Sequence, residues 1–190
     1  MVFVVVTGTP GVGKTVFSKA LAKALGFKYL DVGEFCVKEG YVVGYDEERG
    51  SYIADTDRLK ERLKHLGNGN YVLDGHIAHL AAPLHLVRLV YVLRCHPEVL
   101  RRRLEARGYP PSKVRENVMA EILDICLVEA VELHDGKVCE LDSTGKDVEK
   151  LVSEALAVYR GEAEPKTGIV DWVSRLQQEG LLEKYLKGVV

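Results

Sequence analysis

The chain has no paired cysteine motif, no long apolar run and almost no net charge. Its 190 residues include four cysteines, none in a C-x-x-C pair, so we expect reduced thiols with a packing role. No apolar run is long enough to cross a bilayer, and the N-terminal MVFVVV is too short for a signal peptide. We therefore expect no membrane partner and a cytoplasmic protein, or a nuclear one if the source is eukaryotic. A net charge of −2 excludes an overall field that attracts nucleic acid.

Asparagine and glutamine are also scarce, with three and two residues, whereas Glu, Lys and Arg are plentiful. This balance favours a thermophilic source. Hydrophobic residues make up 47% of the chain and charged residues 28%, as is ordinary for a globular protein with a buried core. The length predicts one compact domain with inserts, and the chain contains no internal repeat.

The most informative segment is Gly8–Thr15, the phosphate loop, which reads GTPGVGKT and matches the pattern G-x-x-x-x-G-K-[ST]. The β-branched run Val2–Thr7 before it predicts a buried parallel strand, and Val16–Leu25 after it has helical spacing. Between a strand and a helix, the backbone N–H groups of such a loop form a cradle for phosphates. This position makes a functional loop a better interpretation than a chance glycine-rich turn. We expect Lys14 to reach the β- and γ-phosphates of a nucleotide and the Thr15 hydroxyl to bind Mg²⁺.

Two glycines inside the loop have a predicted backbone role. At Gly11 and Gly13 a Cβ would collide with phosphate, or the backbone needs a positive φ. The sequence therefore predicts that neither position accepts a larger residue.

Short apolar runs alternate with helical patterns along the rest of the chain. Strands are predicted at Phe27–Leu30, Tyr71–Leu73, Leu86–Leu93 and Lys137–Leu141, and helices at Asp55–Leu66, Pro97–Ala106, Ser112–Leu133 and Gly145–Tyr159. This alternation favours an α/β fold with a five-stranded parallel sheet and helices on both faces. The segment Asp31–Ala54 has no long periodic run and is predicted to be an insert that lies over the site.

The C-terminal part begins with a polar linker, Arg160–Lys166. Asp171–Leu186 follows as a predicted amphipathic helix with Trp172, Leu176 and Leu182 on its apolar face. This helix either docks on the body of the domain or binds a partner.

Asp74 and His76 are the candidates for the second half of a catalytic site. A phosphate loop needs a carboxylate on the Mg²⁺ side at the end of an apolar strand, and Asp74 in YVLDGH has that position. In an extended chain His76 faces the same side as Asp74, where an imidazole can orient water or a phosphoryl acceptor. The alternatives are an aspartate that only ends a strand and a histidine without a chemical role. We assign no role to His79 or His85.

Arg103 and Arg107 are four residues apart, so both can lie on one face of their predicted helix and bind the transferring phosphate. Arg107 adjoins Gly108–Pro111, which breaks the helix and is typical of a mobile lid. A solvated charged helix with pairs such as Arg101–Glu105 is the alternative.

Two further positions lie at the predicted strand ends. Arg94 ends the strand Leu86–Leu93 near the ligand edge. The segment Asp142–Lys146, DSTGK, is predicted to border the nucleotide base, with Thr144 as the candidate contact. Ser143 or Thr144 can at the same time cap the next helix.

Six segments in this order resemble the atypical adenylate kinase group, which comprises adenylate kinase isoenzyme six and its archaeal counterparts. They are GTPGVGKT, YLDVGEF, GYDEE, LDGH, RLEARGYPPSK and AEILDICLVEA. The resemblance implies a P-loop NTPase fold of the nucleoside-monophosphate-kinase type in residues 1–160. It also implies a monophosphate-binding insert at about 31–54 and a lid at about 106–116, whereas 161–190 form the linker and C-terminal helix.

The same resemblance implies site residues. Asp74 and His76 match the D-x-H motif of the group, which is linked to Mg²⁺ and catalysis. Val16 stands where the group usually has a second Thr, so only its backbone N–H can contact phosphate. ATP is expected to bind the loop, the helix before the lid and the lid, at Gly11, Val12, Gly13, Lys14, Thr15, Val16, Arg103 and Arg107, with Arg107 as the lid contact.

Three functions follow from these observations. The first is an Mg²⁺-dependent kinase that converts ATP and AMP, or another nucleoside monophosphate, into two diphosphates. The second, implied by the resemblance, is an ATPase that assists small-ribosomal-subunit maturation and binds a platform ribosomal protein and pre-ribosomal RNA; one protein can have both this function and the first. The third is another small-molecule kinase of the same fold with a different acceptor.

Overall fold

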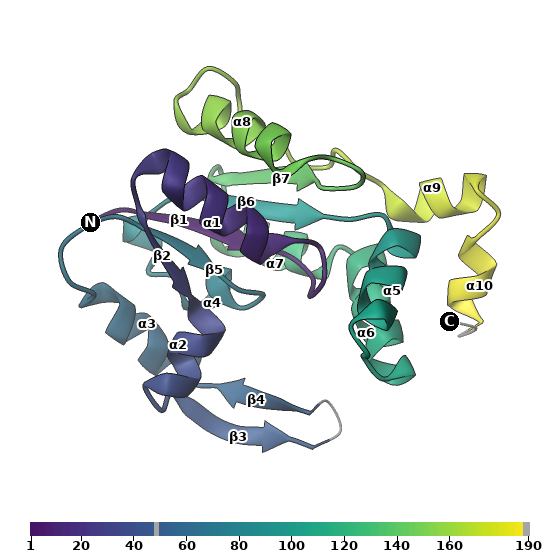
Figure 1. Cartoon of the computed structure of the whole chain (residues 1–190), viewed down its shortest axis with the longest axis horizontal. Helices are drawn as coiled ribbons and strands as arrows, with labels where there is room; N and C mark the ends of the chain where they lie inside the picture. Colours follow the sequence, from purple (N-terminus) through teal and green to yellow (C-terminus); the bar gives the residue numbers. More distant parts are fainter. Residues whose placement is uncertain (48–49, 188–190) are drawn as a thin grey trace.

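A five-stranded parallel sheet forms the centre of the computed structural model, which describes residues 1–47 and 50–187 (Figure 1). Its strand order is β2-β5-β1-β6-β7. The strands are β1 (Phe3–Thr7), β2 (Lys28–Asp31), β5 (Tyr71–Asp74), β6 (Val87–Arg94) and β7 (Val138–Asp142). The predicted α/β fold is therefore confirmed. All five carboxyl ends meet at one edge, where ligands of such folds bind.

Helices cover both faces because successive side chains of each strand point to opposite sides. In β1, Val4 and Val6 enter one hydrophobic core, and Phe3 and Val5 enter the other. The first core is closed mainly by α1 (Lys14–Leu25), α5 (Pro97–Ala106), α6 (Pro111–Ile122) and α8 (Val148–Tyr159). The second is closed by α2 (Val32–Lys38), α3 (Thr56–Lys64), α4 (Ala78–Ala81) and α7 (Ile125–Leu133). The turn η1 (Leu84–Leu86) leads into β6.

The segment 31–54 is more structured than its sequence indicated. It contains α2 and an antiparallel hairpin of β3 (Val42–Asp46) and β4 (Ser51–Ala54), which is separate from the main sheet. The hairpin projects from the body of the molecule on the side opposite α8 (Figure 1). Residues 48 and 49 of this segment lie outside the described residues.

The single helix predicted over Ser112–Leu133 is wrong. The segment forms α6 and α7, because Asp124 adopts a left-handed conformation with φ of 57°. Asp tolerates this conformation better than most residues, and Arg94 holds its carboxylate. The first of these helices, α6, begins at Pro111.

The single helix predicted over Asp171–Leu186 is also wrong. Gly180, with φ of 70°, separates α9 (Trp172–Gln178) from α10 (Leu182–Leu186). Both helices lie beside α5, so this segment docks on the body of the domain (Figure 1). No helix within the described ranges is long and apolar enough to cross a membrane.

Candidate functional site

The phosphate loop lies between β1 and α1, as predicted, and its three glycines have positive φ. The values are 133° at Gly8, 96° at Gly11 and 106° at Gly13. A Cβ at Gly11 would lie 2.8 Å from Leu100 Cδ1 of α5. The backbone conformation thus agrees with the prediction, and close contact with α5 adds a constraint that the sequence did not reveal.

Lys14 is folded back onto the loop. Its Nζ donates to the carbonyl oxygens of Gly8 and Thr9 at 2.8 and 3.0 Å. Burial lowers the pKa of Lys14, and the nearby Asp74 carboxylate acts in the opposite direction. A bound phosphate would therefore stabilise the charged form of Lys14, which burial disfavours.

Asp74 ends β5 directly beside the loop, paired in register with Val6 of β1. Its side chain is buried, and Oδ2 accepts a hydrogen bond from the Tyr29 hydroxyl at 2.9 Å. Burial raises the pKa of Asp74, while hydrogen bonds from Tyr29 and Thr15 and the charge of Lys14 lower it. In the part of the chain that the structure describes, no donor has hydrogen-bonding geometry to the buried Oδ1.

Asp74 and Thr15 fit a hydrated magnesium ion. Mg²⁺ prefers oxygen ligands and keeps several waters, so one carboxylate and substrate phosphates suffice to hold it. Oδ1 of Asp74 is an acceptor that lacks a partner, and the exposed Thr15 lies at the first turn of α1. Within residues 1–47 and 50–187, no group of three His, Cys, Asp or Glu side chains is placed to hold a metal by itself.

His76, two residues after Asp74, lies at the rim of the site, where one part of its side chain is exposed and protein surrounds the rest. Desolvation by the surrounding protein, and then the charge of Lys14, lower the pKa of His76 to about 4. Thr7 fixes this turn, because its hydroxyl contacts the His76 carbonyl oxygen at 3.2 Å and His79 Nδ1 at 2.8 Å. His79, to which we assigned no role, thus supports the backbone that carries His76.

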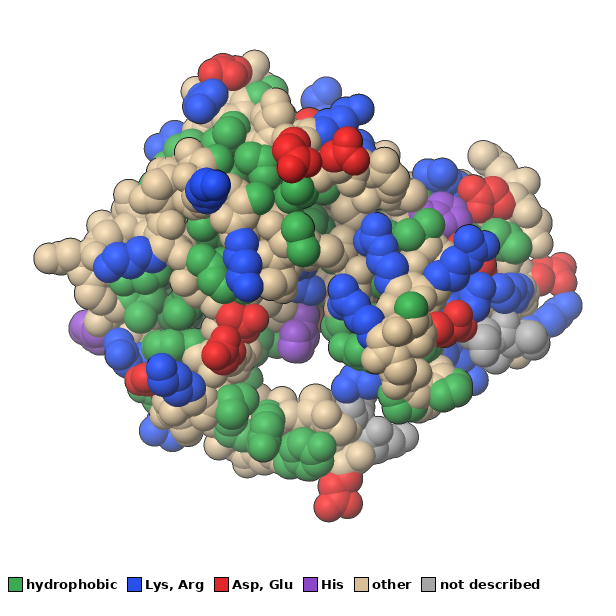
Figure 2. All heavy atoms as spheres, viewed as in Figure 1, with side chains coloured by type: hydrophobic (Ala, Val, Ile, Leu, Met, Phe, Trp, Pro, Cys, Tyr) green, Lys and Arg blue, Asp and Glu red, His purple; other side chains and the backbone are tan. Residues whose placement is uncertain are grey.

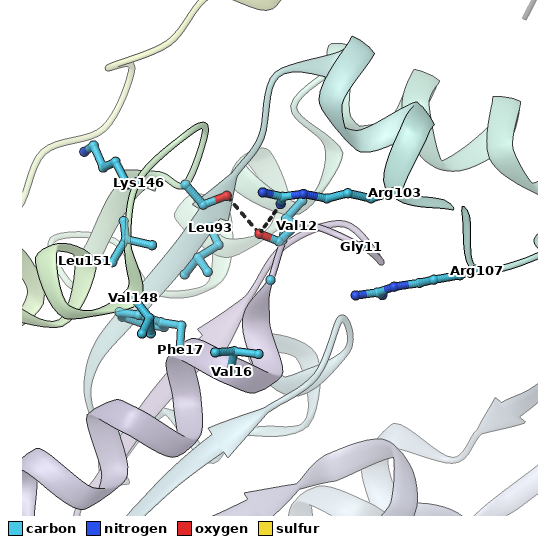
Figure 3. Close-up of a pocket in the computed structure, with 12 residues that line it drawn as sticks. Gly11, Val12, Val16, Phe17, Leu93, Arg103, Arg107, Lys146, Val148 and Leu151 are labelled. Carbon is cyan, nitrogen blue, oxygen red and sulfur yellow. Dashed lines mark hydrogen bonds between the residues drawn. The ribbon is translucent and has the colours of Figure 1, made fainter. Parts of the chain in front are cut away.

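A cavity of about 390 Å³ lies on the α5 and α8 side of the loop (Figure 3). Arg103 of α5 and Arg107, the residue after α5, extend toward it, and the side chains of Val148 and Leu151 form an apolar wall. Its lining residues are Gly11, Val12, Gly13, Val16, Phe17, Leu93, Arg103, Arg107, Ser143, Lys146, Val148 and Leu151.

The loop after β7 borders this cavity, at the position that the sequence predicted for it. Thr144 is absent from the cavity lining, and its hydroxyl accepts the His96 N–H at 2.8 Å. Ser143 and Lys146 line the cavity instead, and the Ser143 hydroxyl contacts the Val12 carbonyl oxygen at 2.8 Å. Neither Ser143 nor Thr144 caps α8, which begins after Asp147.

Arg94 does not line either of the two cavities beside the loop. Its guanidinium is buried and binds three carboxylates, those of Glu121, Asp124 and Glu140. Arg94 is therefore part of the framework under the site.

The expected Arg101–Glu105 pair on α5 is present at 2.6 Å.

A second cavity, of about 600 Å³, lies on the other side of the loop. Thr9 and Pro10 of the loop border it, together with His76, Lys113 of α6 and Ser51 of the hairpin. Figure 2 shows the hollow between the hairpin and the body of the molecule. The loop therefore separates two cavities, and no sequence pattern revealed the second, because its walls come from segments that are distant along the chain.

Comparisons with known proteins agree with this architecture. A family model described as "AAA domain" matches residues 4–124. A shikimate kinase from Acinetobacter baumannii in complex with shikimate has a TM-score of 0.61 at 18% identity, covering 85% of this chain and 94% of that one. A shikimate kinase from Bacteroides thetaiotaomicron has a TM-score of 0.57 at 18% identity, covering 84% and 98%. These structures share the fold.

Two relatives are similar over nearly their whole length. A protein named "Putative adenylate kinase" from Methanocaldococcus jannaschii is 42% identical over 174 residues, which are 90% of this chain and 93% of the relative. A protein of the same name from Pyrococcus abyssi is 40% identical over 169 residues, or 89% and 90% of the two chains. The chain therefore belongs to the family of these archaeal proteins and is an enzyme of the P-loop kinase fold.

Proposed function

We propose that the protein is a nucleoside monophosphate kinase that transfers the γ-phosphoryl group of ATP to AMP. The observation that carries this proposal is the presence of two cavities on opposite sides of one phosphate loop. A phosphotransferase with two substrates needs such an arrangement, because donor and acceptor must meet at the transferring phosphoryl group. The names of the archaeal relatives favour AMP as the acceptor.

On the donor side, the apolar wall of Val148 and Leu151 suits the adenine base, whereas Arg103 and Arg107 suit the phosphates. Lys14 would move from the loop carbonyls to the β- and γ-phosphates. Thr15 and Asp74 would hold Mg²⁺, which neutralises phosphate charge when bound. Thr144 is not needed in this arrangement.

On the acceptor side, Lys113 and His76 face the second cavity, so the monophosphate would lie there with its phosphate toward the loop. An oxygen of that phosphate attacks the γ-phosphorus, and the bond to the leaving ADP breaks. Segment 31–54 would be the monophosphate-binding insert and residues 106–116 the lid. Closure of both excludes water from the transfer.

Product analysis tests this proposal. The protein is incubated with Mg-ATP, alone and with each nucleoside monophosphate, and diphosphate and free phosphate are measured separately. We expect two ADP per AMP consumed and little free phosphate, and Lys14→Ala should remove both products. Equal phosphate release with and without every monophosphate would contradict a kinase.

A second function, ATP hydrolysis on a ribosomal protein or RNA partner, is favoured by one observation. The hairpin beside the second cavity carries exposed large side chains, Val43, Tyr45, Tyr52 and Ile53. Such a surface suits contact with a macromolecule. Phosphate release that rises when small-subunit particles are added would establish this activity.

A further inference from the structure

Trp172, the single tryptophan of the chain, lies in α9 of the C-terminal arm, by which we mean residues 161–187. Its side chain is only 1% exposed. Its indole Nε1–H donates to Glu121 Oε1 at 2.9 Å. A buried donor paired with a buried carboxylate is a strong link, and here it joins the arm to α6.

Glu121 itself connects three parts of the molecule. Its Oε1 also accepts from Arg94 Nε at 2.8 Å and from the Cys95 backbone N–H at 3.1 Å, at the end of β6. Its Oε2 accepts from the Thr9 hydroxyl at 2.6 Å. Thr9 belongs to the phosphate loop, so one carboxylate joins the arm, the sheet and the loop.

The arm has a second attachment, to the start of α5, the helix that carries Arg103 and leads into Arg107 of the donor cavity. Glu179 binds His96 Nε2 at 2.9 Å, and Lys184 binds Glu98 Oε1 at 2.8 Å. Despite partial burial, the hydrogen bonds from Lys184, Tyr185 and Arg101 lower the pKa of Glu98 to about 2. The docked arm therefore restrains both the N-terminal end of α5 and, through Glu121, the loop.

We propose that Glu121 and Trp172 are positioning residues for the phosphate loop, and that docking of the C-terminal arm is coupled to nucleotide binding. Thr9 is held from two sides, by Glu121 at its hydroxyl and by Lys14 at its carbonyl oxygen. When Lys14 turns to the phosphates, Thr9 keeps the Glu121 bond at its hydroxyl and a long backbone contact, from the Val12 N–H to its carbonyl oxygen at 3.4 Å, so Glu121 holds its side chain. Coupling of this kind is reciprocal, so bound nucleotide also stabilises the docked arm.

The inference rests on the nucleotide-binding half of the proposed function and not on the acceptor. Binding of Mg-ADP and Mg-ATP is therefore measured directly by titration calorimetry, without any monophosphate. Thr9→Val removes the hydroxyl but keeps the shape of the side chain. It should weaken both affinities about tenfold, because a buried carboxylate oxygen loses its donor. Thr9→Ser should restore most of the affinity, and Thr167→Val, at an exposed position in the arm, should change nothing.

Trp172 supplies an optical signal for the same coupling. Its fluorescence should change when Mg-ADP binds to the unaltered protein, and this change should be lost in Thr9→Val at saturating nucleotide. Trp172→Phe should weaken binding, and its effect should not add to that of Thr9→Val, because both act through Glu121.

Two outcomes would overturn the inference. One is a folded Thr9→Val protein with unchanged affinity and fluorescence response. The other, which needs no variant, is a Trp172 emission that does not respond to saturating Mg-ADP. If nucleotide binds with this response but AMP is not phosphorylated, the kinase proposal fails and the positioning role stands.

Discussion

His76 combines an open position at the second cavity with a pKa lowered to about 4. Its imidazole is therefore neutral throughout the physiological range, and it can accept or donate one hydrogen bond without bringing a charge. A neutral ring suits the orientation of an acceptor phosphate or a water beside Lys14.

We predict that His76→Ala lowers kcat by about 10²-fold while the affinity for Mg-ATP stays within about twofold. In the unaltered protein, the contribution of His76 should persist as pH falls through 6.5 and disappear only near 4, because the neutral ring is the active form. The measurement is kcat against pH for both proteins, with His85→Ala at an exposed position as the control. A kcat unchanged in His76→Ala would show that this ring has no catalytic role.

The residues that sequence alone could identify are those whose role is local. The spacing of the phosphate loop places Lys14 and Thr15, and the end of an apolar run places Asp74. Glu121 could not be found in this way, because its partners lie 26 to 112 positions away along the chain. Lys146 and Thr144 are two residues apart in one loop, and only the tertiary structure decides which of them borders the cavity.

At the scale of elements, strands and helices followed from periodicity, but two helix breaks did not. No Gly or Pro marks the break before α7, which depends on the contact between Asp124 and Arg94. Gly180 is a visible signal for the second break, since glycine commonly ends helices in the left-handed conformation. Breaks that depend on a tertiary contact are thus hidden from local patterns.

The contact between the loop and α5 gives a prediction at this scale. Gly11→Ala would place a Cβ 2.8 Å from Leu100 and 2.9 Å from Leu104 and would strain a backbone with φ of 96°. We expect the free energy of unfolding to fall by about 3 kcal/mol, since strain and overpacking add. Chemical denaturation of Gly11→Ala and of the unaltered protein, without nucleotide, measures this loss.

The matched control is Gly40→Ala, where φ is 74° and no atom lies within 4 Å of the added Cβ. This variant carries strain alone, and we expect a loss of about 1 kcal/mol. Equal losses in the two variants would mean that α5 yields to the extra methyl group without cost.

At the scale of the whole molecule, Arg94 joins the sheet to the helices that cover it. It extends from β6, and its partners belong to α6, to β7 and to the turn before α7. Glu140 also accepts the Ile169 N–H at 2.7 Å, so the same cluster holds the C-terminal arm. Burial raises the pKa of Glu140, and the charge of Arg94 opposes that shift.

Arg94→Met keeps an unbranched chain but removes the charge from this cluster. We expect the free energy of unfolding at neutral pH to fall by about 3 to 5 kcal/mol, because buried carboxylates lose their cation. Burial already raises the pKa of Glu140, and without the opposing charge of Arg94 this pKa rises further above its unfolded value, so the folded variant binds more protons than the unfolded chain. The difference in unfolding free energy between Arg94→Met and the unaltered protein should therefore shrink as pH falls from 7 to 5. Adding Glu140→Gln to the variant should recover part of this difference at pH 7.

The comparison variant is Arg160→Met, whose arginine is 58% exposed and pairs with Glu162 at 4.0 Å. An exposed pair of this kind contributes about 0 to 1 kcal/mol, and its removal should show no such pH dependence. Urea denaturation at pH 5, 6 and 7 distinguishes the two variants. If the loss of unfolding free energy in Arg94→Met stays constant over this range, lost packing and not the unpaired carboxylates causes the instability. Arg94 would then stabilise the molecule through its aliphatic stem.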